Sequence, residues 1–330
     1  MKAYWYENAG AAADVLVAGE MNAGEPGPGE VRVRIAVSGV NPTDAKRRER
    51  GRELGRFPRI VPNNDGAGVI DAVGAGVDAG RVGERVWIFG AQAGRPMGTA
   101  AEYCVLPSRQ ARPLPDDAGF EDGACLGVPA VTAHRGLFAD GPIDGKTVLI
   151  TGGGGRVGRY AVQMAKHAGA TVIATAGSEE KVAHVAELGA DHALDYKSDD
   201  VAGAVAEVTG GRGVDRMLDV AFGANVAGAA GMIRENGVLA SYGSDAVPAP
   251  SVPFYEFMYK NVLIRPFAIF GMPDAAKDAA FAHVDALLAA GALAHRVGAR
   301  FAFEEMVQAH EAIEADTLFG ACLVEVSKMP

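Results

Sequence analysis

Residues 151–160 read TGGGGRVGRY, and four consecutive glycines suit neither the interior of a helix nor that of a strand. The apolar run KTVLITG (146–152) leads into this stretch, and the helical pattern RYAVQMAKHAG (159–169) follows it. Between a strand and a helix, glycine permits a tight turn, lets backbone N–H groups approach a pyrophosphate and lets the helix pack closely on the strand. The stretch therefore predicts a dinucleotide-binding loop, although its spacing is G-x-x-G-x-x-G and a glycine loop needed only for packing is the alternative. The residues predicted to contact the cofactor here are Gly152, Gly155, Arg156, Val157 and Gly158.

The sequence around this loop alternates strand-like and helix-like segments from about residue 127 to about residue 265. ATVIATAG (170–177) has the pattern of a strand, and EEKVAHVAELGA (179–190) has that of a helix. Such alternation is typical of βαβ units, so we expect a doubly wound parallel sheet of the Rossmann type.

The first third of the chain has a different character, with short β-rich runs such as VRVRIAV (31–37) separated by glycine and proline turns. It predicts a compact, barrel-like β domain, so the fold class is α/β. After residue 265 two helical segments and the strand-like ACLVEV (321–326) follow. Pattern alone leaves open whether this tail extends the parallel sheet or returns to the first domain.

Composition limits the classes of partner. The 330 residues suggest two domains, 49% of them are apolar, and the formal net charge is −10. A negative chain is a poor ligand for nucleic acid or an anionic membrane, so neither is expected as a partner. Three well-separated cysteines, no signal-peptide pattern and no apolar run of membrane-spanning length predict a cytoplasmic protein.

The second strand of the predicted sheet bears on cofactor choice. NAD sites usually place an acidic residue at its end to bind the ribose 2′-hydroxyl. Here the chain has Thr175, Ala176 and Gly177, with Ser178 and Lys181 just beyond. The absence of an acid and the nearby lysine favour NADPH over NADH, with a merely solvated Lys181 as the alternative.

Several segments together resemble the zeta-crystallin-like quinone oxidoreductases, a zinc-free branch of the medium-chain dehydrogenase/reductases. The resemblance runs nearly end to end, and its segments include GVNPTDAK (39–46), VPNNDGAGVI (61–70), LGVPAVTAHRGL (126–137), TGGGGRVGRYAVQMAK (151–166) and LGADHALDY (188–196). It implies a GroES-like β-barrel catalytic domain from residues 1–126 and 267–330, around a Rossmann NADPH-binding domain at 127–266. It also implies a homodimer paired through Rossmann sheet edges, for which VLIRPFAIFG (262–271) is the candidate segment, with burial of this segment within the monomer as the alternative.

The resemblance further assigns site residues. Gly177, Ser178, Lys181 and Tyr196 resemble the pocket for the adenosine 2′-phosphate. Asn41 resembles a polar residue at the nicotinamide and substrate cleft.

No metal is expected, because the positions that hold zinc ligands in related dehydrogenases carry other residues. The chain resembles those enzymes there but has Asn41 for the first cysteine, Asn64 and Asp65 for a His-Glu pair, and Val128 near the third ligand. Amides and one carboxylate make a poor zinc site. Asn41 is expected to donate to the acceptor or the nicotinamide amide, and Asp44 and Asp65 to hold the cleft's shape. The alternative is that all three only cap turns.

Without a Lewis acid the hydride acceptor must already be electrophilic, as quinones and conjugated carbonyls are. The predicted function is therefore zinc-independent, NADPH-dependent reduction of such acceptors. The alternatives are an NADPH-dependent enoyl-thioester reductase and, in another class, an NADPH-binding structural or redox-sensing protein with little turnover. The basic segment KRRERGRELGR (46–56) either rims the substrate mouth or, as we favour, is a solvated charged helix face.

Overall fold

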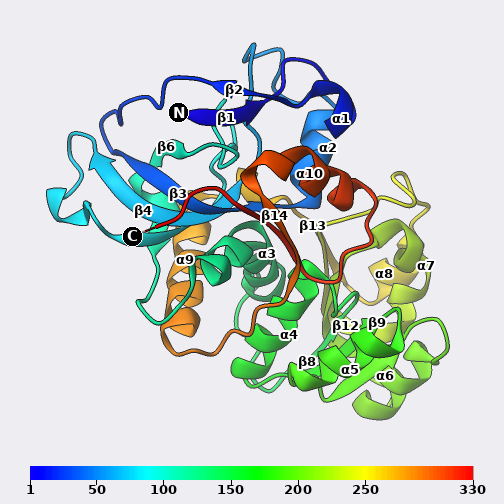
Figure 1. Cartoon of the computed structure of the whole chain (residues 1–330). Helices are drawn as coiled ribbons and strands as arrows, with labels where there is room; N and C mark the ends of the chain where they lie inside the picture. Colours follow the sequence, from blue (N-terminus) through cyan, green and yellow to red (C-terminus); the bar gives the residue numbers. More distant parts are fainter. Residues whose placement is uncertain (330) are drawn as a thin grey trace. The chain divides into compact units, whose positions relative to one another are not determined.

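The computed structural model describes residues 1–329, which form two compact units (Figure 1). One unit combines Met1–Val128 with Val284–Pro330, and the other is Pro129–His283. Helix α3 (Phe120–Phe138) carries the chain into the second unit, and α9 (Asp274–Ala289) carries it back. The chain therefore re-enters the first compact unit at residue 284, whereas the resemblance places the second part of the catalytic domain from residue 267 onward. Residue 267 itself belongs with the second unit, where the backbone N–H of Phe267 donates to the Ser241 carbonyl.

The second unit is built on a six-stranded parallel sheet in the order β10-β9-β8-β11-β12-β13. Counted from β8, this is the order 3-2-1-4-5-6 of a Rossmann sheet. Helices α4 and α5 pack on β8, β9 and β10, and α7 packs on β11 and β12. The apolar strands are buried as a doubly covered parallel sheet requires. The elements are β8 (Thr147–Ile150), α4 (Arg156–His167), β9 (Thr171–Ala176), α5 (Glu179–Glu187), β10 (His192–Asp195), α6 (Val201–Thr209), β11 (Val214–Asp219), α7 (Phe222–Met232), β12 (Ile233–Ser241), α8 (Phe254–Tyr259) and β13 (Leu263–Pro266).

The first unit is built on a mainly antiparallel sheet with the path β14-β15-β3-β4-β5-β7, and β6 pairs with β3. A separate pair, β1 (Lys2–Trp5) with β2 (Val17–Glu20), begins the chain. The other elements are α1 (Ala12–Val15), β3 (Glu30–Val40), α2 (Pro42–Glu49), β4 (Asp65–Val73), β5 (Arg85–Ile88), β6 (Tyr103–Pro107), β7 (Ala111–Pro113), β14 (Val297–Ala302), α10 (Met306–Glu314) and β15 (Ala321–Glu325). An α/β chain with a barrel-like β unit and a Rossmann unit is thereby confirmed.

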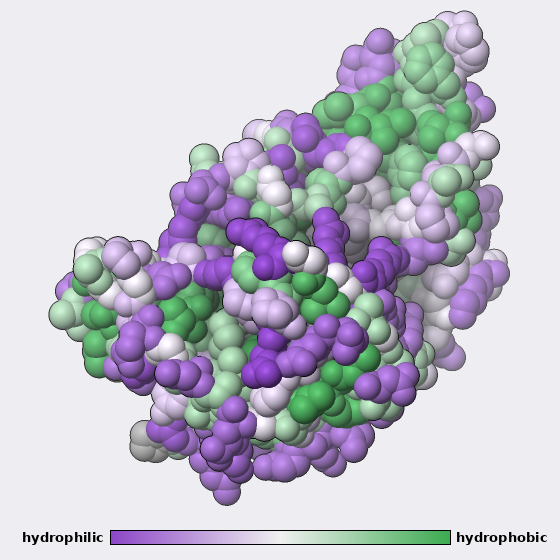
Figure 2. Space-filling view, turned by 90° about the horizontal axis from the view of Figure 1, so that it is seen from above, coloured by the Kyte–Doolittle hydropathy of each residue, from purple (hydrophilic) through white to green (hydrophobic). Residues whose placement is uncertain are grey.

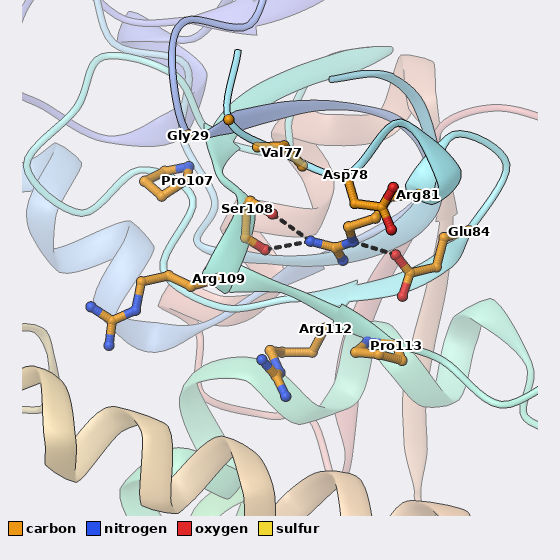
Figure 3. A pocket seen from close by; sticks show the side chains of 11 residues that line it. Gly29, Val77, Asp78, Arg81, Glu84, Pro107, Ser108, Arg109, Arg112 and Pro113 are labelled. Carbon is orange, nitrogen blue, oxygen red and sulfur yellow. Dashed lines mark hydrogen bonds and ion pairs between the residues drawn. The ribbon is translucent and has the colours of Figure 1, made fainter. Parts of the chain in front are cut away.

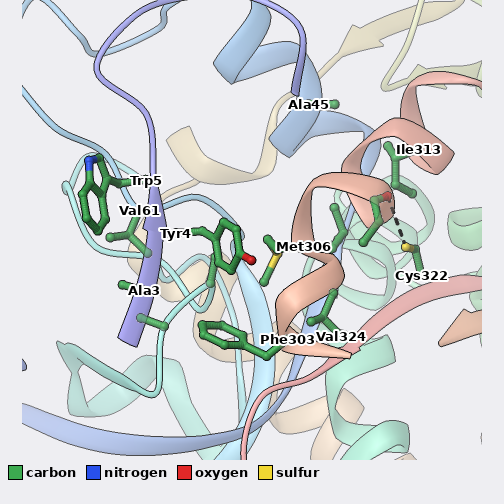
Figure 4. Packing of buried hydrophobic residues seen from close by; sticks show 14 residues of the cluster. Ala3, Tyr4, Trp5, Ala45, Val61, Phe303, Met306, Ile313, Cys322 and Val324 are labelled. Carbon is green, nitrogen blue, oxygen red and sulfur yellow. Dashed lines mark hydrogen bonds between the residues drawn. The ribbon is translucent and has the colours of Figure 1, made fainter. Parts of the chain in front are cut away.

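Both ends of the chain meet in the first unit. Strand β15 pairs antiparallel with β3, with Cys322 opposite Val40. Figure 4 shows Tyr4 of β1 directed toward Phe303 and Met306, and the Tyr4 and Phe303 rings lie edge to face with their centroids 5.3 Å apart. Burial of these apolar side chains stabilises the closure of the unit by residues about 300 positions apart.

No helix within residues 1–329 combines the length and the apolar character that a membrane crossing needs.

Candidate functional site

The glycine loop joins β8 to α4, as the sequence predicts, and backbone contacts require its glycines. Gly152 has a φ of +66°, and a Cβ on Gly158 would lie 2.1 Å from the Gly152 carbonyl oxygen. Gly155 is the N-cap of α4 and makes no side-chain cap, so backbone N–H groups of the first turn, which Arg156 and Val157 begin, can face an anion. The loop is therefore a cradle of bare backbone at a helix N-terminus, which fits a pyrophosphate.

A second group of predicted residues gathers at the end of β9. A Cβ on Gly177 would lie 2.9 Å from the Tyr196 hydroxyl oxygen, so the phenol ring rests against this glycine. Ser178 caps α5, its Oγ accepting from the Lys181 backbone N–H at 3.4 Å. Tyr196 itself is 57% exposed. The structure thus brings Gly177, Ser178 and Tyr196 together on an open surface that a ligand can reach.

Lys181 lies against the glycine loop, because a Cβ on Gly154 would be 3.0 Å from the Lys181 Cβ. The lysine is therefore more than a solvated helix residue, and its stem joins the two groups described above. No acid stands at the end of β9, where Thr175 is buried and the Gly153 N–H donates to its carbonyl at 2.7 Å. This environment suits a 2′-phosphate better than a 2′-hydroxyl.

The sequence reasoning missed one cation of this group, Lys197. Its Nζ donates to the Gly177 carbonyl at 2.5 Å and lies 5.9 Å from the centre of the Tyr196 ring. Its position directly after Tyr196 could have indicated Lys197 from the sequence, but a single lysine in a turn forms no recognisable motif. Two lysines therefore flank Gly177 and Ser178.

The third predicted group, Asn41, Asp44 and Asp65, forms one buried network with Asn64. The Asn41 Nδ2 donates to Asp65 Oδ2 at 2.7 Å, and the Asn64 Nδ2 donates to Asp44 Oδ1 at 2.6 Å. The Asn41 backbone N–H donates to Asp44 Oδ2 at 2.8 Å, so Asp44 also caps α2 as the alternative interpretation expected. The Val128 N–H donates to both oxygens of Asp65 at 2.8 Å.

Burial makes the two carboxylates of this network unusual acids. It raises the pKa of Asp44 to about 6, against the N–H donors that favour the charged form. Burial and then the nearby charge of Asp44 raise the pKa of Asp65 well above its usual value. Two carboxylates held this close in the interior resist being charged together.

These residues do not fit a zinc ion. The positions of the metal ligands hold two amides, a carboxylate and an apolar side chain, with no thiolate or imidazole among them, and Asp65 spends its oxygens on N–H donors. Across residues 1–329 no three His, Cys, Asp or Glu side chains gather in a way that could hold a metal. Cys104, Cys125 and Cys322 are all buried.

Two arginines of the basic segment 46–56 are not solvated, so the favoured interpretation was wrong for them. Arg47 and Arg48 are buried on α2. Arg47 pairs with Glu53 and donates to Gln92 at 3.0 Å, and Arg48 pairs with Glu314 of α10. Sequence pattern could not show this, because Gln92 and Glu314 lie far away in the chain.

The first unit also has a pocket of about 550 Å³, lined in part by Arg81, Ser108 and Arg112 (Figure 3). Its central cation, Arg81, donates to Glu84, to Ser108 and to the Ala111 carbonyl, and Arg112 pairs with Asp285. The predicted site residues are not among those lining it. Arg81 and Arg112 contact the protein's own acids and carbonyls, so we assign the pocket no role in the reaction.

Comparison with known proteins identifies the relatives of this chain. Residues 27–116 match the family described as alcohol dehydrogenase GroES-like domain, and residues 157–286 match the family described as zinc-binding dehydrogenase. The 2-haloacrylate reductase of Burkholderia sp is 34% identical over 70% of this chain and 69% of its own, and the quinone oxidoreductase of Lama guanicoe is 29% identical over 86% and 84%. The solved structure of mycobacterial Rv1454c complexed with NADPH has 28% identity and a TM-score of 0.85, covering 98% of this chain and 100% of its own.

The chain belongs to the medium-chain dehydrogenase/reductase superfamily, in its quinone oxidoreductase branch.

Proposed function

We propose that this protein is a zinc-independent, NADPH-dependent oxidoreductase that transfers hydride to quinones or conjugated carbonyls. The observation that carries the proposal is the network of Asn41, Asp44, Asn64 and Asp65, which replaces a metal site by oriented hydrogen-bond donors. Such donors stabilise an oxyanion but do not supply the strong polarisation that an unactivated ketone needs. The acceptor must therefore be electrophilic by itself.

The cofactor side of the proposal rests on two of the groups described above. NADPH supplies the hydride when bound. The loop of Gly152, Gly155 and Gly158, with Arg156 and Val157, would hold the pyrophosphate. The 2′-phosphate would meet Gly177, Ser178, Lys181 and Tyr196, together with Lys197.

The acceptor side rests on Asn41. An amide nitrogen carries two N–H bonds, and the bond from Asn41 Nδ2 to Asp65 accounts for one of them. We propose that the other donates to the acceptor oxygen or to the nicotinamide amide. Asp65 then fixes the plane of the amide, and Asp44 fixes the turn that carries it.

Replacement of Asn41 by alanine tests this role. We expect kcat to fall roughly 10- to 100-fold with NADPH affinity unchanged, because a donor to developing charge is lost. The matched control is Asn22→Ala, an exposed asparagine of the same unit. Unchanged turnover in Asn41→Ala with intact NADPH binding would rule the role out.

The choice of acceptor needs a direct comparison. NADPH oxidation by metal-stripped protein should be followed by absorbance with 1,4-benzoquinone, with 2-chloroacrylate and with a crotonyl thioester, and NADH should replace NADPH as the control. The name of the Burkholderia relative makes a conjugated carboxylate a reasonable acceptor class. Faster turnover of the thioester would favour the enoyl-thioester reductase, and tight NADPH binding without any turnover would favour a binding protein.

We also propose a homodimer paired through the second unit, whose sheet ends in the edge strand β13. Beside this edge an apolar patch is exposed on α8, where the side chains of Phe254, Tyr255 and Tyr259 are 65%, 65% and 75% accessible. Figure 2 shows apolar residues gathered at the upper right of that view. Exposed apolar surface beside an open edge strand favours pairing with a second copy.

Sedimentation velocity tests the dimer. Tyr259→Glu should convert a dimer into a monomer, whereas Val82→Glu, at an exposed valine of the other unit, should not. A wild-type monomer at micromolar concentration would contradict the proposal. We propose a cytoplasmic location, which the three buried thiols support. We also propose functional domains at 1–126 with 267–330 and at 127–266, which differ from the compact units in that the second unit extends to His283.

A further inference from the structure

A chain of buried polar side chains leads from helix α10 to the backbone of Asp65. His310 on α10, Asn63 in the segment before β4, Ser38 on β3 and Thr99 before β6 are all fully buried. Nε2 of His310 lies 2.9 Å from Asn63 Oδ1, and Asn63 Nδ2 lies 3.0 Å from Ser38 Oγ. Ser38 Oγ lies 2.7 Å from Thr99 Oγ1, which donates to the Asp65 carbonyl at 2.5 Å.

The final acceptor determines the direction of every bond in this chain. A carbonyl can only accept, so the Thr99 hydroxyl must donate its one proton to the Asp65 carbonyl. The hydrogen bond between Ser38 and Thr99 must therefore be donated by Ser38. Ser38 then accepts from the amide nitrogen of Asn63, whose oxygen faces His310. The imidazole must therefore carry its proton on Nε2. Every hydrogen bond of the series then has its donor on the His310 side and its acceptor on the Asp65 side.

The surroundings of His310 support this neutral tautomer. Burial and the charge of Arg48 lower the pKa of His310 to about 3. Its Nδ1 makes no hydrogen bond, so the single proton of the ring is needed at Nε2. In a buried polar chain of this kind, removal of one donor leaves its acceptor without a hydrogen bond and loosens the members that follow.

The chain also reaches a backbone that is held in an uncommon conformation. Asn63 has a φ of +76°, in the left-handed region that favours glycine. The Thr99 N–H donates to the Asn63 carbonyl at 3.0 Å, so the residues at 63 and 99 are joined by backbone as well as by side chains. Asp65, two residues after Asn63, accepts the hydrogen bond from the Asn41 side-chain amide.

We propose that His310 is a positioning residue for the acceptor site, which through Asn63, Ser38 and Thr99 fixes the backbone of Asp65 and thereby the plane of the Asn41 amide. This inference rests on the proposed function, because it assigns His310 to the same site. In this role His310 contacts neither the cofactor nor the acceptor. It acts by supplying the first proton of the chain.

The test compares His310→Leu, which has no donor, with His310→Gln, whose amide N–H can replace Nε2–H. Loss of one buried donor should lower kcat for the quinone roughly five- to tenfold in the leucine variant, and the glutamine variant should recover most of it. The dissociation constant of NADPH, measured by fluorescence, should not change in either. A role confined to stability would lower the melting temperature and leave kcat per folded molecule unchanged, and that result would overturn the proposal.

Asn63→Gly provides a second route that does not depend on whether His310→Leu folds. Glycine accepts the positive φ but breaks the chain at its second member, so the same loss in kcat is expected. Asn236→Gly, another positive-φ asparagine in the other unit, is the matched control. If the hydrogen-bonded chain acts as one unit, kcat of the double variant His310→Leu with Asn63→Gly should lie within about twofold of kcat of either single variant. If the two single-variant losses in kcat multiply in the double variant, the mechanism is refuted.

A readout without turnover separates this inference from the proposed function. The side-chain amide signal of Asn41, assigned by its loss in Asn41→Ala, should shift in His310→Leu and return toward the wild-type position in His310→Gln. An inactive wild-type protein would reject the proposed function while this shift still supported the positioning role. An Asn41 signal that is the same in wild type and His310→Leu would reject the positioning role whatever the activity.

Discussion

The substitution Gly158→Ala tests the assignment of the glycine loop most directly. Gly158 is the third residue of α4, and an added Cβ would lie 2.1 Å from the Gly152 oxygen and 2.7 Å from the Gly153 Cα. Both neighbours are backbone atoms, so no flexible side chain can move aside. Ordinary contact begins at about 3.4 Å, which means that the turn must retreat from the helix by about 1.3 Å.

This displacement gives the expected magnitude. A retreat of more than 1 Å takes backbone N–H groups of the turn out of hydrogen-bond range of a bound pyrophosphate. A hydrogen bond to a charged group contributes about 1.5–3 kcal/mol, so losing two weakens NADPH binding by roughly 100-fold or more. Overpacking of the turn should also lower the free energy of unfolding by about 1–3 kcal/mol.

The assay is calorimetric titration with NADPH beside thermal unfolding. Gly228→Ala is the matched control, because it makes the same change in helix α7 of the same unit, where an added Cβ meets nothing within 4 Å. It should bind NADPH normally and be slightly more stable. If Gly158→Ala binds NADPH within about threefold of wild type, the loop does not hold the pyrophosphate and the reasoning fails.

Three further predictions concern charge and packing. Lys197→Ala should reduce the preference for NADPH over NADH by roughly tenfold in kcat/KM, because a cation beside Gly177 is lost; equal effects on both cofactors would contradict a 2′-phosphate contact. The pKa of Asp44 is about 6 in the folded state against 3.8 in the unfolded state, so between these pH values the folded state binds more protons. The free energy of unfolding should therefore fall by up to roughly 3 kcal/mol as the pH rises through this range. Denaturant titrations of Asp44→Asn should show a smaller fall, because Asp65 then remains the only acid of the network with a raised pKa, and an identical pH profile in both proteins would refute the prediction. Phe303→Ala should lower the free energy of unfolding by about 3–5 kcal/mol in the same titrations, because the ring packs on Tyr4, and a change below 1 kcal/mol would contradict that packing.

Local sequence patterns determined a large part of this protein. The strand, glycine turn and helix at 146–167 follow one another within the chain, so their chemistry is visible in the letters alone. The alternation that produces the Rossmann sheet is local in the same way. The lack of zinc ligands was also visible, because Asn41, Asn64 and Asp65 stand at positions that the family motifs identify.

Only the tertiary structure decided which distant residues meet. The pairing of β15 with β3, the burial of Arg48 against Glu314 and the donation of Lys197 to Gly177 join segments that share no sequence pattern. The chain of hydrogen bonds from His310 to Asp65 spans some 245 residues, and no single member of it stands out as functional. Periodicity reports which face of an element is buried, whereas the partner on that face is chosen by the packing of the whole unit, and that choice makes a network out of scattered side chains.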